Sequence, residues 1–224
     1  GSYGTAVNRE QDGVSGSAAG NVHGDYFMRL RKGEMLAAPV QSCLFIKGNG
    51  VGRNVHNIVV VEEGAELIVI SGCATAEGTD DAAHLGITEV YIEKGGKFTT
   101  TMIHNWGENV AVHPRSSGVM GADAQYISNY VLLHKVKDLK MYPSMYLNGE
   151  NAVARFNSVI VAPEGSHVDS GNKLMLNAPN TRGEIISRTL TTGGVIIHRG
   201  FIGGYNGPAK GHLECKGLIP GQGL

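Results

Sequence analysis

The amino-acid sequence predicts an all-β protein of the β-solenoid type, with little helix. Short apolar runs alternate with Gly-containing turns, and almost nothing sustains an apolar stripe of helical period over three turns. A corner of small residues followed by a strand also recurs, in steps of 31, 26, 28, 31 and 27 residues, beginning at Gly64, Gly95, Gly121, Gly149, Asn180 and Gly207. Recurrence at this spacing is typical of solenoids and repeat arrays.

The residue types explain both the corners and the strands between them. Gly and Asn supply the positive φ that a sharp corner needs, and segments rich in Val, Ile, Thr and Tyr suit a pleated surface packed on one side. From the N-terminus, the expected strands cover residues 42–46, 58–61, 67–70, 89–92, 98–103, 126–133, 153–161, 173–176, 184–190, 195–198 and 213–218. A β-sandwich or barrel would also place short strands between turns, but the recurring corners favour the solenoid.

The first 21 residues lack this pattern. Residues 1–21 are polar and rich in Gly and Ser, which predicts a flexible leader or a remnant of trimming, with Gly1-Ser2 as a cloning scar. Residues 22–224 are then expected to form one domain, because a solenoid can reach this length as a single unit.

The composition excludes several classes of protein. The chain has 224 residues with 33 Gly and 7 Pro, but the Gly has no three-residue period, so collagen is excluded, and the aliphatic runs exclude a wholly disordered chain. Nineteen Lys and Arg against 20 Asp and Glu give a net charge of −1, which predicts no nucleic-acid partner. Apolar runs such as residues 58–61 are too short to cross a bilayer, so no membrane partner is expected. Three widely spaced Cys without a CxxC pair argue against disulfides and favour a reducing cytoplasm.

Cys215 is the principal candidate for a functional residue. Alternate residues of a strand share a face, so Leu213 and Cys215 are expected to point inward, while His212, Glu214 and Lys216 point outward. From the residues alone, a small core side chain is the favoured interpretation, since a free Cys is often buried. A functional thiolate would need a positive group or a metal close by.

The other Cys and His residues are weaker candidates. Cys73 follows an expected strand and begins a polar loop, which predicts a packed or corner thiol, and Cys43 is expected in the core. His198 and His167 could supply ligands or an acid/base pair, although isolated His on strands are more often hydrogen-bonded structural groups. The segment His104-Asn105-Trp106 is expected to form a structural cluster at the end of a strand.

Two enzyme classes with solenoid folds fit the sequence poorly. Polysaccharide lyases of the parallel β-helix type need clustered carboxylates and a basic residue on one face, whereas the acids here are dispersed. Acyltransferase solenoids need a hexapeptide repeat, which the step near 30 residues lacks. The chain also lacks the phosphate-binding GxxxxGK[ST] motif, so nucleotide hydrolysis would have to come from a partner.

Six short motifs, in order along the chain, resemble the SufB/SufD family of iron–sulfur cluster assembly proteins, particularly its archaeal members. The motifs are residues 56–65 (HNIVVVEEGA), Ser71-Gly72-Cys73, His104-Asn105-Trp106, Tyr142-Pro143-Ser144, residues 180–188 (NTRGEIISR) and Arg199-Gly200-Phe201-Ile202. The resemblance implies a right-handed parallel β-helix, in agreement with the corner spacing, with residues 22–224 as the SufB/SufD-like core.

The resemblance also implies a function. It implies a cytoplasmic, non-enzymatic scaffold on which iron–sulfur clusters assemble transiently, partnered by a SufC-type ABC ATPase, a second SufB/SufD-like subunit in a homo- or heterodimer, and a cysteine desulfurase as sulfur source. The family's essential Cys near the end of the β-helix matches Cys215, which favours Cys215 as a sulfur- or iron-binding residue, because soft thiolates suit iron. Weaker candidates are His212, Glu214, Cys73 and His198. The alternative is a non-catalytic structural solenoid that dimerises and presents an interaction surface.

Overall fold

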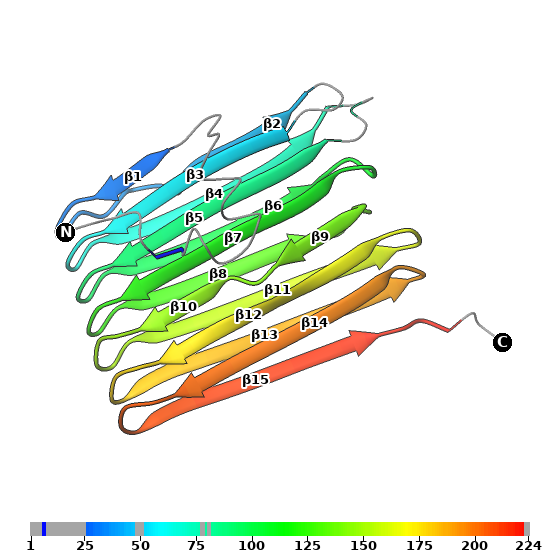
Figure 1. The fold of residues 1–224 in the computed structure, drawn as a ribbon. Coiled ribbons are helices and arrows are strands. Elements are labelled where there is room, and N and C mark those ends of the chain that lie inside the picture. The colour runs from blue at the N-terminus through cyan, green and yellow to red at the C-terminus, as the bar shows by residue number, and fades with distance from the viewer. Residues whose placement is uncertain (1–5, 8–25, 48–51, 77–78, 80–81, 222–224) are drawn as a thin grey trace.

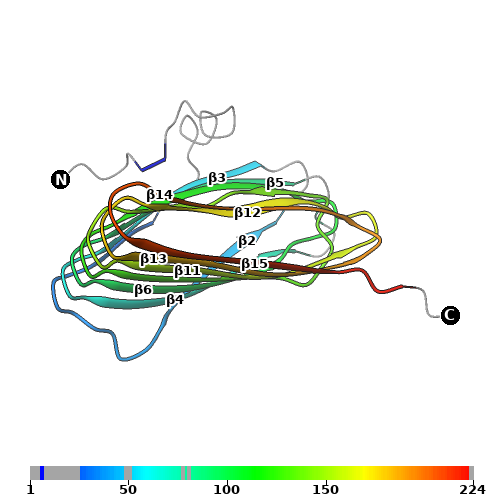
Figure 2. The same cartoon turned by 90° about the horizontal axis from the view of Figure 1, so that it is seen from below.

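In the computed structural model, which describes residues 6–7, 26–47, 52–76, 79 and 82–221, the regular structure of the described residues is entirely β-strand. The strands form two parallel sheets that face each other (Figures 1 and 2). Sheet A contains β1 (Phe27–Leu30), β3 (Gly52–Val61), β5 (Ala83–Ile92), β7 (Ala111–Met120), β9 (Asp138–Met141), β10 (Ser144–Leu147), β12 (His167–Leu176) and β14 (Val195–Gly204). Sheet B contains β2 (Val40–Ile46), β4 (Glu66–Thr75), β6 (Lys97–Asn105), β8 (Gln125–Leu132), β11 (Val153–Pro163), β13 (Thr181–Thr192) and β15 (Ala209–Leu218).

The chain alternates between the two sheets, so that each coil lies on the previous one. Neighbouring coils pair in parallel and in register, as when Val59 of β3 lies beside Val90 of β5. The predicted β-solenoid is therefore confirmed. The alternative of a β-sandwich or barrel is wrong, because such folds are built from antiparallel hairpins, whereas the strands here pair in parallel. No described segment forms a helix that is long and apolar enough to span a membrane.

The predicted corners are also confirmed, with a shift of two residues in two of them. The left-handed backbone conformation falls on Gly64, Gly95, Asp123, Asn151, Asn180 and Gly207. Successive corners bond to one another: the Asp123 amide donates to the carbonyl oxygen of Glu150 at 2.8 Å, and the Asn151 side-chain amide donates to the Asp123 carboxylate at 3.0 Å. Stacked corners of this kind fix the register of the coils.

The interior has two apolar clusters separated by polar side chains. On β11, Phe156 belongs to one cluster, Ile160 belongs to the other, and the buried Ser158 lies between them. The same apolar–polar–apolar order recurs along β8 at Tyr126, Ser128 and Tyr130, but two residues earlier in the pairing register, since Ser128 lies beside Phe156 and Tyr130 lies beside Ser158. We call the polar residues between the clusters the polar midline; they are Ser71, Thr100, Ser128, Ser158 and Ser187 on sheet B and Asn57, Thr88, Ser116, Ser170 and Asn172 on sheet A.

The expectations for two cysteines have different outcomes. Cys73 is buried, which confirms the expected packed thiol, but it lies inside a strand and not at the start of a polar loop, because β4 continues to Thr75. Cys43 was expected in the core, but it pairs with Gly72 on the outward-facing register of sheet B and is exposed. Alternation along β2 explains this, because the inward positions belong to Ser42 and Leu44.

Only Ala6 and Val7 of the expected leader are among the described residues. The Ala6 amide donates to a carboxylate oxygen of the buried Glu89 at 2.8 Å, and Val7 packs against Ile87 on the outer face of sheet A. The remainder of residues 1–21 lies outside the described part of the chain.

Candidate functional site

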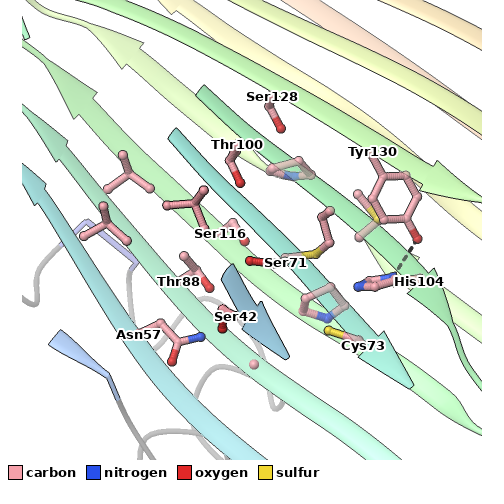
Figure 3. A pocket seen from close by; sticks show the side chains of 18 of the residues that line it. Ser42, Asn57, Ser71, Cys73, Thr88, Thr100, His104, Ser116, Ser128 and Tyr130 are labelled. Carbon is pink, nitrogen blue, oxygen red and sulfur yellow. Dashed lines mark hydrogen bonds between the residues drawn. The ribbon is translucent and has the colours of Figure 1, made fainter. Parts of the chain in front are cut away.

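A cavity of about 270 Å³ lies between the two sheets in the N-terminal half of the solenoid. Hydroxyl and amide side chains of the polar midline line it, together with Cys73, His104 and Tyr130 (Figure 3). The cavity exists because Ser and Thr occupy inward positions where larger apolar side chains would fill the space. A polar cavity of this size accommodates several water molecules or a small polar ligand.

Cys73 is the buried thiol among the residues that line this cavity. It lies on β4, in register with Leu44 and with His104 on the neighbouring strands. Burial raises the pKa of the Cys73 thiol from 9.0 to about 12, and the nearby Cys43 adds to the increase. The thiol is therefore neutral at physiological pH, and it can bind a metal or attack a sulfur atom only after another group has removed its proton.

An aromatic and imidazole cluster adjoins Cys73. His104 Nδ1 lies 2.9 Å from the Tyr130 hydroxyl, and the His104 ring lies 5.3 Å from the Trp106 ring. Burial, with a smaller effect from His84, lowers the pKa of His104 to about 3, so its ring is neutral. The buried indole N–H of Trp106 has no hydrogen-bond partner within the described structure. The cluster is thus a rigid wall with neutral polar groups.

Cys215 lies at the other end of sheet B, on β15. It pairs with the buried Ser187, so its side chain is on the inward face, as the alternation predicts. It is nevertheless exposed, since within the described residues β15 is the last strand of its sheet and no further coil covers it. In the described structure Cys215 is therefore an exposed thiol on the inward face of β15, and not the closed core residue that the residue pattern alone favoured.

The outward neighbours of Cys215 form a surface charge network. Glu214 contacts Arg188 at 2.7 Å, Lys216 at 2.8 Å and His212 at 3.6 Å. The hydrogen bond from Lys216 is the main reason that the pKa of Glu214 is lowered. Because His212 and Glu214 point away from the Cys215 side chain, the structure does not bring these two candidates together with the thiol.

His198 reaches the interior of the terminal coil from sheet A. Its Nδ1 lies 2.9 Å from the Ser170 hydroxyl, and its Nε2 lies 2.7 Å from the Ser187 hydroxyl. Ser187 in turn lies 2.7 Å from Ser158. Burial lowers the pKa of His198, which favours the neutral ring. His198 and Cys215 thus share the terminal coil, whereas Cys73 lies near the opposite end of the stack.

His167 belongs to a separate cluster on the outer face of sheet A. Its Nδ1 and the Nε2 of His113 contact the two carboxylate oxygens of Asp138 at 3.0 and 2.7 Å, and Lys140 contacts Asp138 at 3.2 Å. Asp169, two residues further along β12, forms an ion pair with Arg199 of β14. Within the described residues, no three His, Cys, Asp or Glu side chains are arranged to hold a metal ion.

The Asp138 cluster predicts a loss of stability in acid. Burial alone would raise the pKa of Asp138, but hydrogen bonds from His167, His113 and Lys140 outweigh it and lower the pKa from 3.8 to about 2. The carboxylate therefore stabilises the fold above pH 3.8, and this contribution disappears as the pH falls towards 2. Urea unfolding measured between pH 5 and pH 2 should show a shallower decline for Asp138→Asn than for the unsubstituted protein. Parallel declines in the two proteins would contradict this assignment.

Comparison with known proteins identifies the family. A family model described as "SUF system FeS cluster assembly, SufBD core domain" matches residues 44–203. The chain belongs to the SufBD family. Similar SufBD proteins include one from Archaeoglobus fulgidus, which is 45% identical over 213 residues, covering 95% of this chain and 57% of the relative. The matching family model and this relative are both described by iron–sulfur cluster assembly.

Two further relatives extend the comparison. A SufBD family protein of Methanothermobacter thermautotrophicus is 41% identical over 197 residues, covering 88% of this chain and 48% of the relative. The SufB protein of Bacillus subtilis is 29% identical over 201 residues, covering 88% of this chain and 43% of the relative. The chain thus spans about half the length of the curated relatives it matches.

The sequence alone identified Cys73 and Cys215, the two inward-pointing cysteines of this SufBD chain, but not the side chains that surround them. It did not predict the cavity, the hydroxyl groups that line it, or the contact between His104 and Tyr130. A signal was present, since Ser and Thr recur at inward positions of successive strands, as at Ser71 on β4 and Thr100 on β6. Recognising it requires the pairing register, which the sequence does not state.

Proposed function

We propose that this chain is a scaffold component of a SUF-type iron–sulfur cluster assembly complex, with Cys215 holding sulfur or iron. The observation that carries the proposal is the position of Cys215, whose side chain faces the interior while remaining accessible at the terminal coil. A thiol in this position can exchange sulfur or iron with a partner and is sheltered on its inner side. Thiolate sulfur is also a preferred ligand of iron–sulfur clusters.

The interior of the solenoid supports a role in handling sulfur. Cys73 lies in the cavity near one end of sheet B and Cys215 lies at the other end, with the polar midline between them. A reactive sulfur species held in this interior would be separated from bulk solvent and oxidants. In the proposal, Cys73 is a second, protected thiol and Cys215 is the point of exchange.

A second SufB/SufD-like subunit would complete the site. One cysteine cannot hold a cluster, and no three-residue metal site is present among the described residues. The terminal coil carries exposed apolar side chains on β14 and β15, including Phe201, Leu213 and Leu218. β15 also has an unpaired edge within the described sheet, and such an edge favours association with another chain. We propose that a subunit docked here, in a homo- or heterodimer, contributes the missing ligands.

The remaining partners of the proposal come from the family. The chain would work in the cytoplasm with a SufC-type ATPase and receive sulfur from a cysteine desulfurase, and it would catalyse no step itself. The family assignment supports this, together with the relatives named for iron–sulfur cluster assembly.

Anaerobic reconstitution with ferrous iron and sulfide tests the role of Cys215. The unsubstituted protein should develop the visible absorbance of an iron–sulfur cluster, and Cys215→Ala should lose it, because a thiolate ligand is removed. Cys43→Ala is the matched control, since Cys43 is equally a free, exposed cysteine but faces outward on β2. Equal absorbance in Cys215→Ala and the unsubstituted protein would reject the role and favour a purely structural solenoid.

A further inference from the structure

Glu89 is a buried carboxylate on the outer face of sheet A. Residues alternate along β5, so Ile87 and Glu89 point outward while Val90 packs in the interior. Ile87 and Glu89 are each 1% exposed, whereas Ile197, which points outward from β14 of the same sheet, is 44% exposed. The outer face at β5 is therefore covered. The described residues that lie on it are Ala6 and Val7, which are outside the solenoid on the side of sheet A (Figure 2).

Three groups meet the Glu89 carboxylate. The Ala6 amide donates to Oε2 at 2.8 Å, the Tyr91 hydroxyl donates to Oε2 at 2.5 Å, and His56 Nε2 lies 3.0 Å from Oε1. A buried carboxylate is costly unless hydrogen-bond donors surround it. His56 and Tyr91 belong to the sheet itself, whereas the third donor is a backbone amide, which every residue except proline can supply. The site therefore accepts its last donor from a peptide backbone.

A second polar group on the same face has no partner among the described residues. Ser117 lies beside Glu89 in the register of β5 and β7, so the two side chains are neighbours on the outer face. Ser117 is 8% exposed, and its buried hydroxyl oxygen has no hydrogen-bond partner within the described structure. The N–H and C=O of one residue point to the same side of an extended chain. One residue of a bound peptide can therefore donate to Glu89 and accept from Ser117.

We propose that the outer face of β5 and β7 is a docking site for an extended peptide, with the chain's own segment at Ala6–Val7 as its exchangeable occupant. Glu89 accepts the backbone N–H of the peptide, and Ile87 packs against the aliphatic side chain that follows it. The segment is exchangeable because one backbone amide and one apolar side chain make its described contacts with the sheet. A peptide that is not tethered to the solenoid can also pair with Ser117. The site lies on sheet A and involves no cysteine, so it is independent of the role proposed for Cys215.

Hydrogen exchange of the Ala6 amide, followed by NMR in the full chain, tests the anchor. Glu89→Ala should make this amide exchange at least about tenfold faster, because a hydrogen bond to a charged acceptor is lost. Asp169→Ala is the matched control, since Asp169 is another carboxylate of sheet A but pairs with Arg199, and it should leave the Ala6 amide unchanged. The amides of β8, in the middle of sheet B, show whether each variant remains folded. Equal exchange of the Ala6 amide in Glu89→Ala and the unsubstituted chain would overturn the inference.

Binding of a separate peptide tests the exchange. Ala6→Pro in the full chain removes the amide donor without altering either sheet. A fluorescein-labelled peptide of residues 1–10 (GSYGTAVNRE) should bind this variant at least about tenfold more tightly than the unsubstituted chain, whose own segment competes at high effective concentration. Fluorescence anisotropy measures the binding.

Two controls identify the groups that hold the peptide. The same peptide with proline at its sixth position should not bind, because it lacks the donor to Glu89. Ser117→Ala, added to the Ala6→Pro chain, should weaken binding of the original peptide at least about threefold, since one hydrogen bond is lost. Failure of the original peptide to bind the Ala6→Pro chain, equal binding of the proline peptide, or unchanged binding after Ser117→Ala would each overturn the proposed site.

Discussion

Iodoacetamide at pH 8 should alkylate Cys43 and Cys215 of the folded protein while Cys73 reacts at least about a thousandfold more slowly than an ordinary thiol. The pKa of Cys73 is raised from 9.0 to about 12, chiefly by burial, so its thiolate fraction falls by that factor. Cys43 and Cys215 are exposed. Timed alkylation followed by peptide mass spectrometry measures the three cysteines in one experiment.

Unfolding supplies the control for this experiment. In urea the burial of Cys73 is lost, so all three cysteines should react at similar rates. Rapid alkylation of Cys73 in the folded protein would show that the cavity admits reagent and solvent freely, which would remove the physical basis for a protected interior thiol.

Gly149→Ala should be the most destabilising single-methyl change in the solenoid. A Cβ at Gly149 would overlap backbone atoms of Gly121 and Ala122 in the corner of the neighbouring coil. No rotamer change can relieve a clash with backbone, so the coils would have to separate at this corner. We expect a loss of about 3 kcal/mol in the free energy of unfolding, at the upper end for overpacked sites. Thermal unfolding should show a decrease in Tm of about 10 °C.

Gly72→Ala is the matched control for Gly149→Ala. Gly72 lies on β4, and a Cβ added there would meet nothing within 4 Å. Its backbone conformation is an ordinary one for an L-residue, so alanine should leave the stability unchanged or raise it by about 0.5 kcal/mol. A similar loss in both variants would show that the tight stacking of the Gly149 corner does not limit stability.

The fold was predictable because its two determinants are local. Strands show as short apolar runs, and corners show as Gly or Asn in positions that recur at nearly constant spacing, which the left-handed conformations at Gly64 and Asn180 confirm. The ends of strands were less predictable. β4 continues through Ser71, Gly72 and Cys73, polar or small residues that resemble a loop in sequence but pair with β6 in the structure.

The candidate site was predictable only in part. The inward orientation of Cys215 followed from alternation along one strand, whereas its exposure depends on the absence of a covering coil in the described structure. His198 was a candidate for its residue type alone. Its contacts with Ser170 and Ser187 join residues from three strands, and such contacts depend on stacking and register, which a single sequence does not encode in a readable form.

The coils stack on one another, each with strands in both sheets, and this arrangement has a consequence for hydrogen exchange. Each coil is stabilised mainly by the two coils that flank it, so the molecule behaves as a one-dimensional array whose end units have a single neighbour. β14 and β15 form such an end unit in the described structure. Amide protons there should exchange with solvent sooner than those in the middle of the stack. Within the described residues, opening of the coil formed by β14 and β15 would expose Cys215 while the coils in the middle of the stack stay folded.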